Sequence, residues 1–186
     1  MRTRISVFLI LLFSASILLS DLARAQTAST TGGLEKPIGK IITAAGDIIL
    51  EHAATVVVLA SVDPTVRAKA GDLVYRGDVI QTGRDGKLDL TFTDGTTFNI
   101  SSNARMVLDE FVYDPNGRSN STFFSLTKGT FNFVAGKVAQ TGNMKVDTPV
   151  GTMGIRGTAP RIEISENGTV TFSTLVESNT IRPGAR

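Results

Sequence analysis

The apolar segments between Ile38 and Ser173 are the feature that most limits what this chain can fold into. Each segment is short, alternating or β-branched, and Gly, Asp or Asn bounds it within a few residues. Apolar residues at every second position form one buried face of a strand, whereas a helix repeats them every three or four positions. The 18 glycines among 186 residues suit the many turns that such strands need. We therefore predict an all-β domain.

Three short patterns predict individual elements. Asp94-Gly95 and Asn167-Gly168 each separate two apolar segments, and the positive φ angles of such dipeptides suit tight hairpin turns. The continuous apolar run Val56–Leu59 predicts a strand buried on both faces. We expect six phenylalanines to supply the bulk of the core: Phe92, Phe98, Phe111, Phe124, Phe131 and Phe133.

Weak internal echoes bear on how these strands are arranged. Gly71–Val74 is echoed six residues later by Gly77–Ile80, and Asp85-Gly86 recurs nine residues later as Asp94-Gly95. Echoes of this kind suit the stacked coils of a short twisted β-solenoid. A β-sandwich or meander explains them nearly as well, so both architectures stay open at this point.

The first 25 residues have the three parts of a secretory signal peptide. Arg2 and Arg4 form a basic start, Ile5–Leu19 is apolar apart from serines, and Ala23-Arg24-Ala25 places small residues at the cleavage site. The apolar stretch of 15 residues would span only about 22 Å as a helix, against roughly 30 Å of membrane hydrocarbon. We therefore predict cleavage and export to the periplasm or, alternatively, to the medium or the cell surface.

The rest of the chain divides by composition. Residues 26–37 have little to bury and are expected to form a flexible leader. The β domain is expected over residues 38–176, followed by a polar tail over 177–186. No later stretch approaches the roughly 20 apolar residues that a membrane-spanning helix needs, so we expect a soluble mature product without a membrane span.

Charge and residue counts exclude several function classes. Cleavage after Ala25 would remove three arginines and one aspartate from the 19 basic and 17 acidic residues. The resulting neutral chain argues against nucleic acid or anionic lipid as the main partner. The absence of cysteine and the single histidine exclude disulfides, thiol nucleophiles and multi-histidine metal sites. That histidine, His52, lies beside Glu51 near a turn and is expected to be exposed. Asp85 and Asp94 are explained as turn formers, and we expect no metal and no cofactor.

Val146–Thr158 is the densest cluster of motif-like residues. Its glycines at positions 151, 154 and 157 resemble a phosphate-binding loop only superficially, because such a loop precedes a helix and the strand-like Arg161–Ile164 follows here. We interpret these glycines as part of a strand edge, where glycine permits a close backbone approach or a bulge.

Four blocks in a fixed order resemble the FecR domain family. The match extends from about Gly39 to Ile164, and the order and spacing of the blocks make it specific, although each block alone would be a weak signal. The blocks are Gly71-Asp72 with Gly77–Gly83, Leu90–Thr96, Leu126 with Gly129 and Phe131, and Val146–Pro149 with Ile155–Thr158.

The resemblance implies both a fold and a role. The family's domain resembles a twisted β-solenoid, which favours that architecture here over the sandwich or meander. The family is named for a regulator that relays iron-dicitrate transport status from the outer membrane across the periplasm to a cytoplasmic sigma factor. This chain has an export signal in place of the regulator's cytoplasmic and transmembrane parts. We therefore expect a stand-alone exported FecR domain, to which the sigma-factor relay does not carry over.

The last block supplies the candidate recognition residues. Arg156, between Gly154 and Gly157, is placed to present its guanidinium to a carboxylate of a ligand or partner, and the alternative is an internal ion pair with an acidic residue such as Asp147. Gly157 is expected where any Cβ would strike a neighbouring strand, and the Thr158 hydroxyl is expected to bond a backbone group. The full set is Asp147, Thr148, Pro149, Gly154, Arg156, Gly157 and Thr158.

These observations favour a function without catalysis. The leading hypothesis is a periplasmic or exported β domain that binds a protein partner or a small ligand, in envelope sensing or signalling. The alternative is a structural role in envelope assembly, in which open solenoid edges pair with further strands. An exported hydrolase ranks third, because no serine lies in a Gly-x-Ser-x-Gly elbow and no pair of acidic residues stands out. We assign no catalytic residue.

Overall fold

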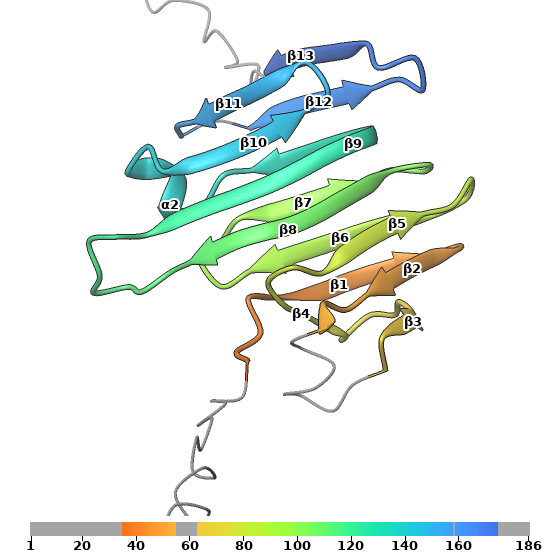
Figure 1. Ribbon diagram of the computed structural model, residues 1–186, viewed down its shortest axis with the longest axis horizontal. Coiled ribbons are helices and arrows are strands. Elements are labelled where there is room, and N and C mark those ends of the chain that lie inside the picture. The colour runs from red at the N-terminus through yellow and green to blue at the C-terminus, as the bar shows by residue number, and fades with distance from the viewer. Residues whose placement is uncertain (1–34, 55–62, 158, 175–186) are drawn as a thin grey trace, which may run out of the picture. The chain divides into compact units, whose positions relative to one another are not determined.

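The computed structural model describes residues 35–54, 63–157 and 159–174 (Figure 1). Within these ranges thirteen strands make up the regular structure, together with the short helix α2 (Lys137–Gln140). The all-β prediction is therefore confirmed. The predicted signal peptide, the strand Val56–Leu59 and the tail over 177–186 lie outside the described residues, as does most of the predicted leader.

The strands follow the apolar segments of the sequence. In β6 (Lys87–Phe92) and β7 (Thr97–Ile100), for example, every second residue is buried, as the two-residue period of a strand with one face in the core requires. The other strands are β1 (Gly39–Ala45), β2 (Ile48–Glu51), β3 (Thr65–Arg67), β4 (Leu73–Val74), β5 (Val79–Thr82), β8 (Arg105–Val112), β9 (Ser121–Val134), β10 (Met144–Thr148), β11 (Gly151–Ile155), β12 (Pro160–Ile164) and β13 (Val170–Thr174).

These strands form one curled sheet that folds over on itself into two layers (Figure 1). In the first, here called the β6 layer, the strand order is β4-β1-β6-β7-β9-β12-β13. In the second, the β8 layer, the order is β3-β2-β5-β8-β9-β10-β11. All of these pairings are antiparallel except that of β10 with β9, which is parallel.

The sequence echoes do not mark stacked coils. β4 follows the first Gly-Asp echo and pairs with β1, whereas β5 follows the second and pairs with β2 and β8. The two echoing strands thus lie in different layers, and Gly-Asp recurs because both strands begin after a turn. Asp85-Gly86 and Asp94-Gly95 lie beyond opposite ends of β6. The described residues form a curled antiparallel sheet and do not show the predicted solenoid.

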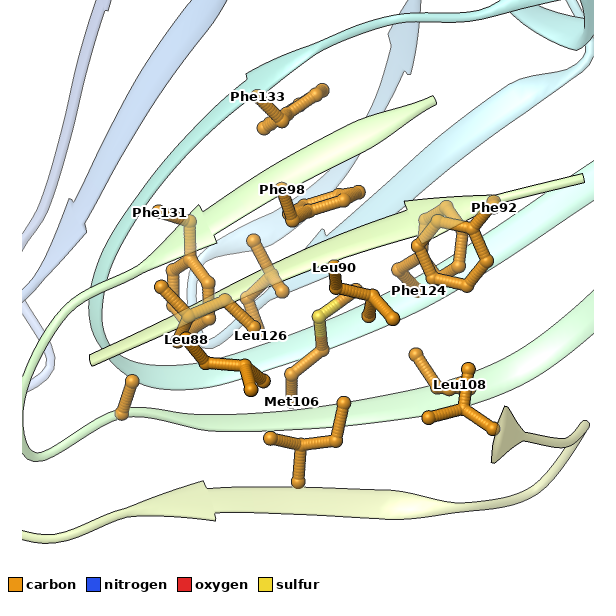
Figure 2. Close-up of a cluster of buried hydrophobic side chains, with 14 of the residues drawn as sticks. Leu88, Leu90, Phe92, Phe98, Met106, Leu108, Phe124, Leu126, Phe131 and Phe133 are labelled. Atoms are coloured by element: carbon orange, nitrogen blue, oxygen red, sulfur yellow. The ribbon is translucent and has the colours of Figure 1, made fainter. Parts of the chain in front are cut away.

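The core lies between the two layers (Figure 2). All six phenylalanines predicted for it are buried. Phe92 of the β6 layer packs against Phe111 and Phe124 of the β8 layer, with ring centroids 5.3 and 4.9 Å apart. Phe98 stacks on Phe133 within the β6 layer, at a centroid distance of 4.5 Å. Burial of these large rings holds the layers face to face.

β9 is the strand that both layers share. Residues 121–128 pair with β8, whereas residues 129–134 pair with β7 and β12. The change of layer occurs at Gly129, whose φ of +102° is one that residues with a Cβ rarely adopt. A Cβ built on Gly129 would lie 2.4 Å from the Cα and the Cβ of Ala104, which is itself buried. Glycine is therefore required here both for the backbone conformation and for the close approach.

The bend in β9 generates the first prediction. Gly129→Ala should lower the free energy of unfolding by more than about 2 kcal/mol, because it combines an unfavourable φ with a backbone clash. Gly142→Ala is the matched control: its φ of +83° is equally unfavourable, but the added Cβ meets nothing within 4 Å, so about 1 kcal/mol is expected. Urea unfolding followed by far-UV circular dichroism measures both losses. Equal losses would contradict a tight contact between Gly129 and Ala104.

Candidate functional site

The hairpin of β10 and β11 carries most of the candidate recognition residues. Pro149-Val150 forms its exposed turn. The Thr148 side chain is buried, and its hydroxyl donates a hydrogen bond to the carbonyl oxygen of Gly151 at 2.9 Å. Asp147 accepts a hydrogen bond from the hydroxyl of Thr152 on the facing strand. Asp147 and Thr148 therefore stabilise the hairpin in which they lie.

Arg156 does not form the ion pair with Asp147 that was the alternative interpretation. Arg156 is exposed directly after β11, and no ion pair of the described residues includes it. The reason is the register, because Asp147 faces Thr152 and Met144 faces Ile155. Arg156 thus lies about four strand positions from Asp147, or roughly 13 Å along the strand at about 3.3 Å per residue.

The prediction of a crowded Gly157 is wrong. A Cβ added at Gly157 or at Gly154 would meet no atom within 4 Å, and both residues are exposed. Gly157 is favoured for a different reason, since its φ of +60° lies in the left-handed region. The other member of this pair, Thr158, lies outside the described residues. The block after Pro149 thus forms an edge strand in which Ile155 is buried in the core, whereas Gly154 and Gly157 are open to solvent.

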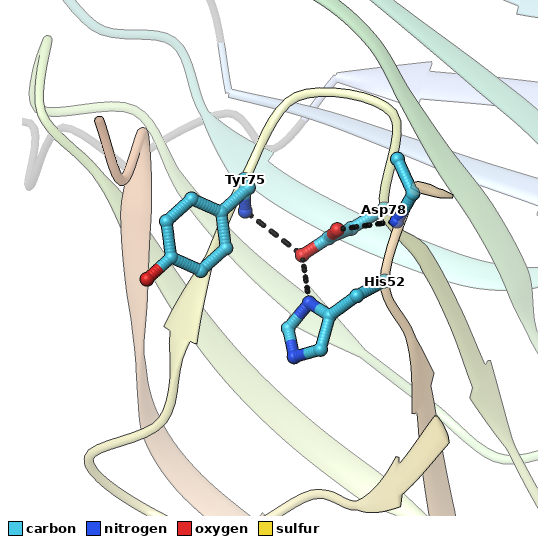
Figure 3. A network of polar contacts seen from close by, with 4 residues as sticks. His52, Tyr75 and Asp78 are labelled. Atoms are coloured by element: carbon cyan, nitrogen blue, oxygen red, sulfur yellow. Dashed lines mark hydrogen bonds and ion pairs between the residues drawn. The ribbon is translucent and has the colours of Figure 1, made fainter. Parts of the chain in front are cut away.

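A buried carboxylate, Asp78, organises the turn between β4 and β5 (Figure 3). Its Oδ2 accepts a hydrogen bond from the backbone N–H of Tyr75 at 2.8 Å and lies 2.9 Å from Nδ1 of His52. Its Oδ1 accepts a hydrogen bond from the N–H of Ala53 at 3.2 Å. The His52 ring also packs edge-on against the ring of Tyr75. The carboxylate thereby joins the end of β2 to the β4–β5 turn.

Burial raises the pKa of Asp78 above its usual value of 3.8. The hydrogen bond from Tyr75 and the charge and hydrogen bond of His52 act in the opposite direction, but they do not outweigh the loss of hydration. Both oxygens are occupied by donors from the protein itself. This arrangement is that of a carboxylate which holds a turn together.

The expectation that His52 is exposed is wrong, because its side chain is only 6% exposed. Its partner is Asp78, 26 residues further along, whereas the neighbouring Glu51 accepts a hydrogen bond from Gln81 at 2.9 Å. The Gly77-Asp78 echo was the sequence signal for this turn, since Asp at a turn bonds nearby backbone N–H groups. It could not show that the end of β2 lies against it.

Asp94-Gly95 and Asn167-Gly168 occupy the turns between β6 and β7 and between β12 and β13. The buried Asp94 carboxylate accepts hydrogen bonds from the N–H and the hydroxyl of Thr96, both at 2.9 Å, and from the N–H of Val138 at 3.3 Å. It therefore joins its own turn to the start of α2. Asn167 Oδ1 accepts a hydrogen bond from the N–H of Thr169 at 3.0 Å, and Gly168 has a φ of +82°.

Within residues 35–54, 63–157 and 159–174, no three His, Asp or Glu side chains lie close enough to share a metal ion. In the same ranges no helix is long and apolar enough to cross a membrane.

The Asp78 contacts generate the second prediction. Asp78→Asn should lower the free energy of unfolding at pH 7 by about 2 kcal/mol or more, because the amide group would set a donor against a backbone or imidazole donor. Asp109→Asn is the matched control, since Asp109 is exposed on β8, and a change within about 0.5 kcal/mol is expected. Thermal and urea unfolding of both variants beside the parent measures the difference.

The raised pKa adds a pH dependence to this comparison. A carboxyl group with a raised folded-state pKa contributes stability that is fully present below the unfolded value of 3.8 and is lost as pH rises through the folded value. The stability advantage of the parent over Asp78→Asn should therefore shrink as pH rises from 3.8. An advantage that grows with pH would show that the pKa is lowered instead.

Comparison with known proteins places this structure in a family. Neither the curated proteins nor the solved structures give a significant match. The family model of the FecR protein matches residues 78–179, more than half of the 186 residues. The match begins at the buried Asp78 and includes the β10–β11 hairpin, while residues 39–77, over which the resemblance was expected to extend, lie outside it. The chain therefore belongs to the FecR protein family.

Proposed function

We propose that this chain is an exported, non-enzymatic FecR domain that binds a protein partner in the bacterial envelope, in a sensing or signalling role. The family assignment supports the envelope role. The three-part N-terminal pattern supports export to the periplasm, with the medium or the cell surface as the alternative.

The exposure of Arg156 is the observation that carries this proposal. Asp147 and Thr148 of the same block use their side chains within the hairpin. Arg156 extends from the end of β11 and forms no ion pair with a described residue. A guanidinium group offers five donors in a plane that fits a carboxylate, so an acidic side chain of a partner is the group it would bind best.

A protein partner is favoured over a small ligand by the position of Arg156. Small-molecule sites are concave and surround most of the ligand. Arg156 instead follows an exposed edge strand, which a second protein can approach without a cavity. The neutral mature chain would not attract acidic molecules in general, so recognition would depend on this local positive charge.

Arg156→Ala tests the proposed role and provides the third prediction. The melting temperature should stay within about 2 °C of the parent, because an exposed side chain without a partner contributes little to stability. Capture of the partner from envelope extract by the immobilised domain should fall about tenfold, since a charge-assisted hydrogen bond is lost. Arg156→Lys should restore part of the binding.

Arg118→Ala is the control for nonspecific charge effects. Arg118 is also exposed and forms no ion pair with a described residue, so its loss should leave capture unchanged. A partner that is retained equally by the Arg156→Ala variant would contradict the role of this residue. A clear fall in melting temperature for Arg156→Ala would show that the side chain serves the fold.

A second candidate function is structural assembly through strand edges. The specific observation in its favour is that β11 and β13 each pair with a neighbour on one side only among the described strands. Unpaired edges are templates for further strands.

A further inference from the structure

At one end of the described domain, each layer finishes in a strand that has a described partner on one side only. The β8 layer ends with β11, whose described partner is β10, and the β6 layer ends with β13, whose described partner is β12. β10 and β12 both pair with β9, so the two free edges are equally far from the shared strand. Figure 1 shows β11, β12 and β13 together at this end of the domain. Two sets of backbone N–H and C=O groups are thus presented at the same end of the described domain.

These two edges lack the usual protection against pairing. Exposed edge strands commonly carry Lys, another charge, a proline or a bulge that prevents association with further strands. β11 reads Gly-Thr-Met-Gly-Ile and β13 reads Val-Thr-Phe-Ser-Thr, with no charged residue and no proline. Their registers with β10 and β12 are continuous over five residue pairs each. Both edges are therefore regular and uncharged.

The core is incompletely covered at this end. Phe172 of β13 faces Ile162 of β12 in the register, so both side chains point into the space between the layers. Ile162 is fully buried, whereas Phe172 is 44% exposed. Met153 of β11 and Val170 of β13 are also only partly buried where they pack against the core. An apolar strip therefore lies between the two free edges.

The opposite end of the layers is closed by the chain itself. β4 and β3 are the outermost strands there and have only two and three residues. The segment between them crosses from one layer to the other, with Ala68 buried in the core. Its backbone is bonded to both layers, from the N–H of Ala68 to the carbonyl of Ile48 at 3.0 Å and from the N–H of Gly71 to the carbonyl of Ile41 at 2.9 Å. Among the described residues, the β11–β13 end is thus the one that combines free edges of five residues with exposed core side chains.

We propose that a second copy of this chain covers the β11–β13 end, with β11 pairing with β11 and β13 with β13 about a single two-fold axis. An axis perpendicular to a sheet turns an edge strand and its copy into an antiparallel pair. One axis serves both layers because their free edges lie at the same end. Self-pairing would set identical residues near one another, and the absence of charge on both strands avoids like-charge repulsion.

A second copy can pair with both free edges and cover the apolar strip, whereas an extended peptide cannot. A peptide strand would pair with one edge and leave the other edge and the apolar strip in water. A copy of the domain brings two edges and its own Phe172 at once, so both layers and the core continue across the interface. The inference rests on the assembly role named above, and Arg156 lies directly after the strand that would pair rather than within it.

Charged edge variants test the dimer without disturbing the fold. Gly154 faces Lys145 and Thr171 faces Glu163 in the register. Gly154 also lacks a positive φ and has open space for a side chain. In the double variant with Gly154→Glu and Thr171→Lys, each new charge therefore faces an opposite charge within its own chain. In the two-fold dimer, each new charge lies near its own copy.

Sedimentation velocity of the mature protein over about 1 to about 300 µM gives the fourth prediction. The parent should change from monomer to dimer with rising concentration, and the double variant should have a dissociation constant at least about tenfold higher. Its melting temperature, measured where the parent is monomeric, should be unchanged. The control Thr97→Lys lies exposed on β7, which has a strand on each side, and should dimerise like the parent.

Three results would overturn the proposal. The first is a parent that stays monomeric at every concentration. The second is a double variant that dimerises as tightly as the parent. The third is a monomer in which the free-edge amides of β11 and β13 are protected from hydrogen exchange, because another part of the same chain would then cover them. Binding to the Arg156-dependent partner is measured separately, so either proposal can fail without the other.

Discussion

Both layers of the domain depend on the continuity of β9. Its first part completes the β8 layer and its second part completes the β6 layer, so the hydrogen bonds of one strand fix the registers of β8 and β7 together. The bend between the parts is possible because Gly129 adopts a φ of +102° against Ala104. Phe124 and Phe131 lie on the two sides of this bend and are both fully buried. The core is thus built around a strand that belongs to both of its walls.

The residues that resemble the FecR family serve this architecture at several points. Thr82 accepts a hydrogen bond from the N–H of Ala104 at 2.8 Å and donates one to the carbonyl of Ser101 at 2.6 Å, which positions the segment that Gly129 contacts. Asp78, four residues earlier, fixes the turn at the other end of β5. Much of the shared pattern therefore specifies the fold. Arg156 and the free edges are left with groups that another molecule can bind.

Sequence reasoning succeeded where local chemistry decides the structure. Period-two alternation located the strands and the buried phenylalanines, and Asp-Gly and Asn-Gly marked hairpin turns, because both signals depend on a few neighbouring residues. It failed where the answer depends on which segments meet. Alternation shows that a side chain points inward but not which layer it belongs to, so the pairing of His52 with Asp78 and the open surroundings of Gly157 could not be predicted. The Gly-Asp echoes suited stacked coils and a meander almost equally well, because turn chemistry and coil repetition give the same pattern.

Native-state hydrogen exchange along β9 tests the central claim most directly. If the shared strand makes the two layers one cooperative unit, the amides of Leu126 and Phe131, on either side of Gly129, should exchange through the same global unfolding. Their exchange free energies should then agree with each other and with the free energy of unfolding from urea, and should fall together as urea is added. If the two layers instead open separately, one of these amides will exchange at a distinctly lower free energy than the other. That result would contradict the account.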